Sequence, residues 1–408
     1  TPLGSRIAEV HNGSSLFTGD AGQGESNIRR WLIENDWLEA IVALPLNIFY
    51  NTGIATYIWV LTNRKPEHRR GKVQLIDATQ WFKPLRKNLG KKNCELAPDD
   101  IQRICDTYLA FKETPQSKIF PNAAFGYWKV TVERPLRLHS QLSVKAIESL
   151  RFASGDEELR GPLYEAFGEA LVKEWPRVQS ALEKWLADWA DESDESGESD
   201  EAPKHGLSER TKRRLLDPAT WERDARLVEV ATALRQELGG DLFEDHNIFR
   251  DRVDAAIKKL GLKLSAADLK LILRAVSWRE ESAPPVIARL RPVRQVQPDP
   301  LHGLYQATVR GKPCLVEYEP DPDLRDTEQV PLLEPGGIEA FIRREVLPYT
   351  PDAWIKADAT KIGYEISFTR HFYQPQPLRT LDAIRADILA VEQEAEGLLD
   401  ELLKEKRP

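Results

Sequence analysis

Residues 1–143 alternate short apolar runs with segments of helical periodicity, and this alternation limits the architecture of the chain more than any single motif does. Strands and helices in such an order form a sheet with helices packed against it, so we predict an α/β fold here. A complete doubly wound sheet has more strands, so we expect part of a domain. The apolar runs are 6–10, 37–45, 55–66 and 72–79, and the helical segments are 27–36 and 99–113.

The glycine-rich stretch TGDAGQGESNIRRWLIEN, residues 18–35, looks at first like a phosphate-binding loop. Gly19 and Gly24 have the required spacing, but Glu25 stands where a lysine must reach the phosphates. The preceding HNGSSLFT is not a buried strand. The dinucleotide fingerprint also fails, because Asn27 takes the place of its third glycine and no acid follows the run 37–45. We predict a flexible glycine loop that leads into a helix starting near Glu25 or Ser26.

The middle of the chain is mainly helical. Residues 144–187 have helical periodicity, and eight acids with interleaved serines then lie between Asp188 and Glu201. Like charge and low hydrophobicity predict a solvated linker over 188–204. The alternative is an acidic segment that attracts a basic partner.

A second helical domain is predicted over 205–283, and an α+β segment over 284–376 with a hairpin formed by LYQATVR and CLVEYEP. The helical domain carries a basic cluster. Such a cluster can contact nucleic-acid phosphates, although a solvated helix face is the simpler interpretation. Its members are Lys212, Arg213 and Arg214.

The last segment, 377–408, contains an apolar heptad seam. Spacings of three and four residues alternate for about three heptads, as in a coiled-coil-like helix. A lone helix cannot bury such a seam, so its partner is either another helix of this chain or another subunit. The candidate docking residues are Leu381, Ile384, Ile388, Val391, Leu398 and Leu402, with Ala395 completing the seam.

Composition describes a soluble globular protein, with 41% apolar and 30% charged residues among 408. No apolar run reaches the length of a membrane span, and nothing resembles a signal peptide. Three cysteines without metal-ligand spacing suggest reduced thiols, so we predict a cytoplasmic protein with no metal site. The net charge of −8 argues against a chain that blankets nucleic acid by itself.

Long blocks of the sequence resemble the modification subunits of Type I restriction–modification systems, which are adenine-N6 DNA methyltransferases. The blocks are GSRIAEVHNGSSLFTGDAGQGESNIRRWLIENDWLEAIVALPLNIFYNTGIATYIWVLTNRK, KIFPNAAFGYWKVTVERPLRL, LLDPATWERDARLVE, LILRAVSWREESAPPVI and IGYEISFTRHFYQPQPLRTLDAIRADILA. The resemblance implies that residues 1–143 are the C-terminal half of a Rossmann-like methyltransferase domain. It implies S-adenosylmethionine as the cofactor of the complete enzyme. The implied partners are a specificity subunit, a restriction subunit and DNA. No membrane partner is implied.

Two motifs of that family are absent from the chain. The glycine loop that holds the methyl donor lies upstream in the family, and so does the Asn-Pro-Pro-aromatic motif that holds the target amino group. The chain begins at Thr1 and contains no methionine, so we expect a fragment or an engineered sequence. We therefore assign no catalytic residue, and we predict that this chain alone binds no S-adenosylmethionine and transfers no methyl group.

Residues near the third apolar run are the remaining site candidates. By resemblance, Phe49 or Tyr50 stacks on the extruded base, with core packing at a strand end as the alternative. Arg69 and Arg70 are candidate phosphate contacts. Two other functions stay open. One is a non-catalytic scaffold that docks through its C-terminal helix, and the other is a nucleotide-binding enzyme that uses residues 18–26.

Overall fold

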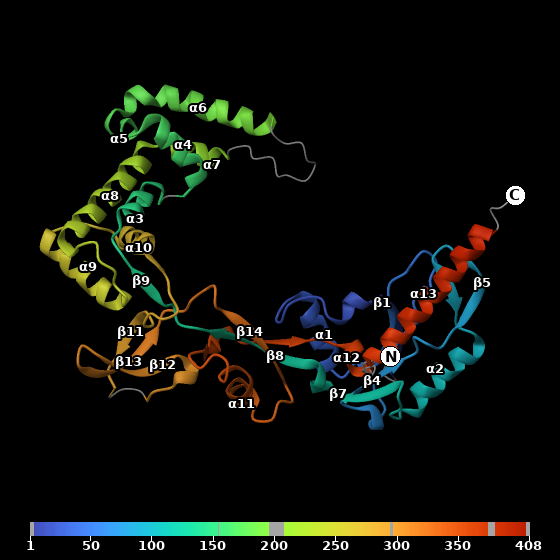
Figure 1. The fold of residues 1–408 in the computed structure, drawn as a ribbon. Coiled ribbons are helices and arrows are strands. Elements are labelled where there is room, and N and C mark those ends of the chain that lie inside the picture. The colour runs from blue at the N-terminus through green and yellow to red at the C-terminus, as the bar shows by residue number, and fades with distance from the viewer. Residues whose placement is uncertain (1–3, 154, 196–207, 294–296, 374–379, 405–408) are drawn as a thin grey trace. The chain divides into compact units, whose positions relative to one another are not determined.

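The computed structural model describes residues 4–153, 155–195, 208–293, 297–373 and 380–404. The chain forms two compact units, whose elements are labelled in Figure 1. Unit 1 comprises 1–129, 329–337 and 361–408, and unit 2 comprises 130–328 and 338–360. The predicted continuous boundary at residue 143 is thus wrong, because the chain leaves unit 1 at Lys129 and later returns to it twice.

Unit 1 is built on a five-stranded mixed sheet with the order β1-β3-β2-β4-β7. Strands β2 and β4 are parallel, and the other neighbours are antiparallel. The four predicted apolar runs are confirmed as strands β1 to β4. The strands are β1 (Arg6–Asn12), β2 (Leu38–Ala43), β3 (Thr56–Thr62), β4 (Lys72–Asp77) and β7 (Ser117–Pro121), and the helices are α1 (Gly24–Glu34) and α2 (Pro98–Ala110).

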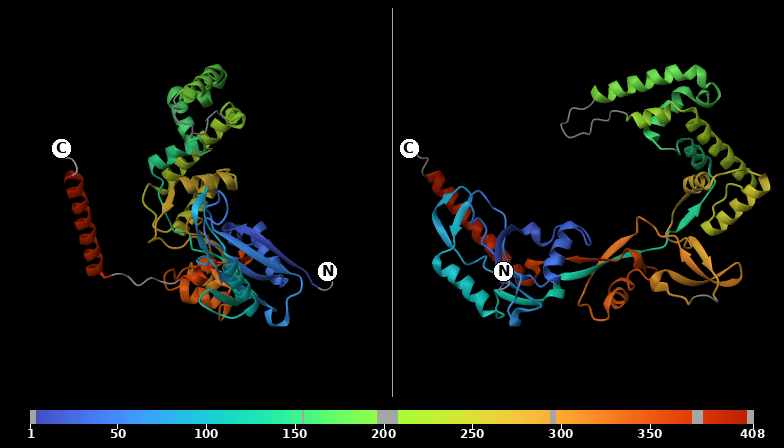
Figure 2. Two further views of the ribbon diagram at one scale, coloured as in Figure 1. Left: turned by 90° about the vertical axis from the view of Figure 1, so that its right-hand side faces the viewer. Right: turned by 180° about the vertical axis from the view of Figure 1, so that it is seen from behind.

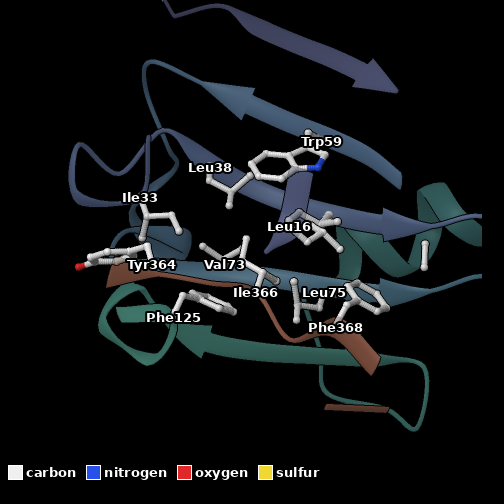
Figure 3. Close-up of a cluster of buried hydrophobic side chains, with 12 residues drawn as sticks. Leu16, Ile33, Leu38, Trp59, Val73, Leu75, Phe125, Tyr364, Ile366 and Phe368 are labelled. Carbon is white, nitrogen blue, oxygen red and sulfur yellow. The ribbon is translucent and has the colours of Figure 1, made fainter. Parts of the chain in front are cut away.

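The core of unit 1 joins residues from both ends of the chain. Every residue of β2 is buried, which explains why that strand reads as one apolar run rather than an alternation. Figure 3 shows Ile33, Leu38 and Trp59 in one cluster with side chains from the C-terminal part of the chain. Those C-terminal members are Tyr364, Ile366 and Phe368. Residues 361–372 therefore belong to the same hydrophobic core as the N-terminal sheet.

Strand β8 (Gly126–Glu133) explains the divided boundaries. Its first residues pair with β16 (Lys361–Tyr364) in the register Lys129↔Lys361, which carries the chain back into unit 1. Its last residues pair with β15 (Trp354–Ile355) in unit 2. Strands that pair across so many residues leave no pattern in the local sequence. The predicted domain boundaries, which rest on local patterns, therefore missed this pairing. The other elements at this return are β14 (Asp326–Pro331), α12 (Phe368–Phe372) and α13 (Leu381–Lys404).

Unit 2 contains most of the helices. Asp217 caps α8 by accepting a hydrogen bond from the Ala219 amide, and Gly239, with a φ of 87°, follows its last residue. Helix α9 packs beside α8 (Figure 2) around a core that contains Phe249 and Leu234. The helices are α3 (Val144–Ser149), α4 (Glu157–Phe167), α5 (Ala170–Lys173), α6 (Trp175–Glu195), α7 (Glu209–Leu215), α8 (Pro218–Leu238), α9 (His246–Leu260) and α10 (Ala266–Ala275).

The β part of unit 2 contains the predicted hairpin. Strands β12 and β13 are antiparallel and close with Val309 opposite Lys312, so the two predicted runs pair as a hairpin. The remaining elements are β9 (Leu138–Ser140), β10 (Ser277–Arg279), β11 (Ile287–Arg291), β12 (Leu304–Val309), β13 (Lys312–Tyr318), α11 (Gly337–Phe341) and a π-helix (Ile342–Val346).

The acidic segment is only partly described. Helix α6 continues to Glu195, so the predicted linker begins as helix, and residues 196–204 lie outside the described residues. No helix in the described parts of the chain is both long and apolar enough to cross a bilayer.

Candidate functional site

The parallel strands β2 and β4 end side by side at one edge of the sheet, with Ala43 opposite Asp77. The amide of Ala78 donates to the oxygen of Ala43 at 3.0 Å, and the amide of Leu44 donates to the oxygen of Thr56 at 2.9 Å. These bonds fix where the two following segments leave the sheet. In open α/β sheets, the carboxyl ends of parallel strands are where ligands bind.

The segment after β2 forms a tight, exposed turn. Asn47 and Asn51 have φ angles of 57° and 55°, a conformation that asparagine tolerates better than most residues. The amide of Thr52 donates to the oxygen of Phe49 at 3.3 Å, which closes the turn over Tyr50. Sparsely populated backbone conformations held by surrounding contacts are common at binding sites.

Both predicted aromatic candidates lie on this turn. Tyr50 is 67% exposed and Phe49 is 39% exposed, so neither ring is a core residue. Ile48, directly before them, is buried in the cluster beneath the turn. The buried Ile48 thus anchors the turn, and the turn holds two adjacent aromatic side chains at the surface. An exposed aromatic ring is suited to stack on a nucleobase.

A basic β-hairpin, which was not predicted from the sequence, lies against the same turn. Strands β5 (Lys83–Leu89) and β6 (Lys92–Glu95) pair antiparallel, with Gly90 at the turn in a left-handed conformation (φ 60°). Figure 1 marks β5 in unit 1. Leu-Gly between two short runs is a turn signal that could have been recognised. The runs contain many lysines and few apolar residues, so they do not read as strands.

Two contacts attach the hairpin base to the segment after β2. The buried Cys94 thiol donates to the oxygen of Leu46 at 3.2 Å, and the amide of Asn93 donates to the oxygen of Asn47 at 3.2 Å. Burial raises the pKa of the Cys94 thiol, which keeps it protonated as a donor. Trp81 packs beside Cys94 in the same buried cluster, so the hairpin has a rigid base.

The hairpin turn also touches the aromatic turn. A Cβ placed on Gly90 would lie 2.2 Å from Oδ1 of Asn51 and 3.3 Å from Cε2 of Tyr50. Only glycine fits at this distance and at this φ. The Phe49–Gly53 turn and the β5–β6 hairpin are therefore one continuous surface, which we call the turn–hairpin surface.

Family comparison identifies the segment that carries this surface. Residues 3–126 match the family described as N-6 DNA Methylase. This segment is therefore similar to that family. The matched residues include β1 to β7, the aromatic turn and the basic hairpin. The resemblance to adenine-N6 DNA methyltransferases is thereby confirmed for the methylase segment.

Individual relatives are similar to part of the chain. The MjaIX methylase subunit of a type I restriction enzyme from Methanocaldococcus jannaschii is 35% identical over 92 residues, which are 22% of this chain and 16% of the relative. The HindI methylase subunit of a type I restriction enzyme from Haemophilus influenzae is 38% identical over 107 residues, or 26% of this chain and 22% of the relative. The alignments thus cover less than a quarter of either relative.

A solved structure of a type I restriction–modification methyltransferase subunit from Streptococcus thermophilus is also similar. It is 26% identical, with 29% of this chain and 24% of that chain covered and a TM-score of 0.25.

The phosphate candidates in the methylase segment divide into a buried and an exposed residue. Arg69 is 3% exposed, and its guanidinium contacts Glu39, Gln74 and the oxygen of Tyr108. Those partners occupy the side chain within the fold, so the prediction of a phosphate contact at Arg69 does not fit the structure. Arg70 is exposed, and its role stays a prediction.

The glycine stretch of the methylase segment is not an open cradle. Helix α1 begins at Gly24, close to the expected start. The guanidinium of Arg29, 2% exposed, donates to the oxygens of Thr18 at 2.7 Å, Ser15 at 3.1 Å and Tyr364 at 2.7 Å. Arg29 therefore holds the loop closed against the helix.

The basic cluster of α7 belongs to unit 2. Lys212 lies 3.5 Å from a carboxylate oxygen of Glu209, and Arg214 contacts Asp156. Arg213 is exposed. Two of the three charges are thus partly neutralised locally, and a role in phosphate binding stays a prediction.

The C-terminal seam lies on α13, and its first four predicted residues are exposed. The exposed fractions are 85% for Leu381, 39% for Ile384, 61% for Ile388 and 65% for Val391. Three of these four side chains are more than half exposed in the described structure. Leu398 and Leu402 fall within the backbone of α13, and their side chains lie outside the described residues.

Proposed function

We propose that this chain is part of the modification subunit of a type I restriction–modification system. Such a subunit performs S-adenosylmethionine-dependent adenine-N6 methylation of DNA together with a specificity subunit. The observation that carries the proposal is the position of Tyr50. Within a segment of the N-6 DNA methylase family, this exposed aromatic stands at the carboxyl edge of the parallel pair β2 and β4. An extruded base is held in part by stacking on aromatic or apolar side chains.

The residues present do not fit S-adenosylmethionine. Within residues 18–26, Arg29 binds the oxygen of Thr18, and a Cβ on Gly19 would lie 2.7 Å from Oε2 of Glu25. At the sheet edge, Oδ1 of Asp77 already accepts from the amide and hydroxyl of Thr79 at 3.0 and 2.6 Å. We therefore derive no step through the methyl donor. The chain alone is expected to be inactive, with donor binding supplied by residues outside it.

Within the proposal, the chain contributes the surface that receives DNA and the helix that receives a partner. Phe49 and Tyr50 are the candidate stacking residues. The exposed stripe of α13 is the candidate docking element for the specificity subunit. A restriction subunit is a further proposed partner, and DNA is bound within the assembled complex in the cytoplasm.

A second function rests on the same helix. A non-catalytic scaffold would need only an apolar stripe open to a partner, and Leu381, Ile388 and Val391 provide one. This alternative requires no DNA contact. It predicts a chain that binds another protein and leaves that protein's affinity for DNA unchanged.

The experiment that separates the two functions is reconstitution with a type I specificity subunit from the same genome. We expect the purified chain to be captured by that subunit and to tighten its binding to target duplex DNA. The chain alone should give no methylated adenine and no retention of radiolabelled S-adenosylmethionine. Capture without any change in DNA affinity would favour the scaffold, and failure of capture would contradict the proposed function.

A further inference from the structure

The turn–hairpin surface carries a concentration of positive charge that the fold of unit 1 does not use. Residues 83–95 contain five basic side chains and one acid, in a chain whose net charge is −8. Like charges on a two-stranded hairpin repel one another and do not help it to form. The basic residues are Lys83, Arg86, Lys87, Lys91 and Lys92.

These charges are free within the described structure. Lys65, Arg69 and Lys129 each contact a carboxylate in unit 1. None of the five hairpin cations is within ion-pair distance of a carboxylate among the described residues, and all but the partly buried Lys92 are exposed. Cations that lack an internal partner are available to an external anion.

The hairpin is held in place by uncharged groups. Cys94 and Trp81 are buried at its base, and the Asn93 amide binds the oxygen of Asn47. Replacing the cations therefore leaves these attachments intact. The basic residues are therefore available for binding an external ligand, and they do not attach the hairpin to the rest of unit 1.

The hairpin lies next to an exposed aromatic side chain, and this position indicates which class of anion would bind. The would-be Cβ of Gly90 lies 3.3 Å from the ring of Tyr50, so Lys91 is adjacent to a side chain suited to stack on a base. Cations that flank an exposed aromatic are the arrangement that binds a nucleotide with its backbone phosphates. A free phosphate or an acidic peptide would bind the cations without stacking on the ring of Tyr50.

We propose that the β5–β6 hairpin is a phosphate clamp for duplex DNA, with Lys87 and Lys91 contacting backbone phosphates beside the nucleotide that lies on Tyr50. This inference rests on the proposed function for the choice of DNA. It adds a backbone-binding element to the aromatic turn. The clamp positions the strand and carries no sequence information, because phosphate contacts are the same for every base.

The test compares two charge-matched double variants of the full chain. Lys87→Gln with Lys91→Gln removes two hairpin cations. Lys258→Gln with Lys270→Gln removes two exposed lysines from helices α9 and α10, neither of which forms an ion pair within the described structure. Both variants have the same net charge, so a difference between them reports the position of the charges.

Binding is measured by fluorescence anisotropy on a short labelled duplex with one unpaired adenine, from ~50 to ~200 mM salt. Loss of two phosphate contacts should lower the slope of log K against log salt by about 1.8 and raise the Kd roughly tenfold at the lowest salt. The control variant should keep the slope of the unaltered chain. A circular dichroism spectrum identical to that of the unaltered chain shows that the hairpin variant is folded.

Two results overturn the clamp. One is an equal slope for the hairpin variant and the unaltered chain, and the other is an equal loss in both variants, which indicates general charge rather than a site. Absence of duplex binding by the unaltered chain at the lowest salt also contradicts it. Capture by the specificity subunit is read in a separate experiment, so the proposed function can stand while the clamp fails.

Discussion

The thiol of Cys94 lies 3.2 Å from the main-chain oxygen of Leu46, and this bond joins the basic hairpin to the segment that follows β2. Cys94 is buried, whereas Cys105 on α2 is exposed. We therefore expect iodoacetamide to alkylate Cys105 readily and Cys94 hardly at all, because burial both blocks access and raises the pKa of the Cys94 thiol.

Substitution of Gly90 should expose that thiol. Gly90→Val places a branched side chain where Asn51 Oδ1 already lies and where φ is 60°, so the hairpin must move away from the aromatic turn. Alkylation of Cys94, read by peptide mass spectrometry, should then rise several-fold while that of Cys105 stays constant. Unchanged protection of Cys94 would show that the two turns are not tightly joined.

Arg29 should be a determinant of stability in unit 1. Arg29→Met keeps most of the side-chain volume but removes the donors to the oxygens of Ser15, Thr18 and Tyr364. Hydrogen bonds from a charged group contribute ~1.5–3 kcal/mol each, so we expect a loss of about 3 kcal/mol or more in chemical denaturation. The neighbouring Arg30→Met, which removes only an exposed pair with Glu34, should cost less than ~0.5 kcal/mol. Equal effects would contradict the structural role of Arg29.

His246 should make unit 2 sensitive to acid. Burial, with a smaller effect from Arg250, lowers the pKa of His246 to about 4, and its Nδ1 lies 2.8 Å from the Ser140 hydroxyl. In the unfolded chain the imidazole of His246 binds a proton near pH 6.5, whereas in the folded chain it stays neutral down to about pH 4. Its contribution to the free energy of unfolding is therefore fully present above pH 6.5 and is lost as the pH falls from 6.5 toward 4. The loss between pH 7.5 and 5 should be about 2 kcal/mol.

The measurement for His246 is urea unfolding of the chain at the two pH values, followed by a signal from the helices. His246→Gln cannot titrate, so its stability should change less between pH 7.5 and 5 than that of the unaltered chain. An acid-induced loss of the same size in the variant would assign the effect to carboxylates instead.

Helix α13 should be the docking element for the specificity subunit. Burial of one leucine-sized side chain stabilises an interface by roughly 1.5–3 kcal/mol, so Ile388→Asp with Leu398→Asp should abolish capture in a pull-down. The matched control is Ala386→Asp with Gln393→Asp, two positions that helical spacing puts on the opposite face. Undiminished capture by a well-folded seam variant would contradict the docking role. Collapse of the whole fold would show that the seam is covered within the chain.

The sequence predicted elements well where the pattern was local. The continuous apolar run that contains Leu38 became a fully buried strand, and the seam of α13 became a single helix. Caps such as Asp217 and stops such as Gly239 act within a few residues, which makes helix ends recognisable. These features depend on neighbours in the chain rather than on tertiary structure.

The unpredicted parts depend on distant contacts. Tyr364 enters the core of unit 1 from the other end of the chain, and no periodicity near residue 364 indicates this. Arg69 looked like an exposed cation because its neighbours are charged, whereas Glu39, inside a strand that reads as apolar, neutralises it. The basic hairpin was missed because its base is held by Trp81 and Cys94 rather than by strand-forming residues along its length.

The most direct test of the account is photocrosslinking of the chain to a duplex that carries one unpaired 5-iododeoxyuridine. The uracil should stack on the exposed ring of Tyr50, so the crosslinked peptide, identified by mass spectrometry, should contain that residue, and Tyr50→Leu should remove the crosslink. Crosslinks that map only to aromatic residues of unit 2, such as Tyr349 or Trp189, and that persist in Tyr50→Leu, would contradict the claim that the turn after β2 receives DNA.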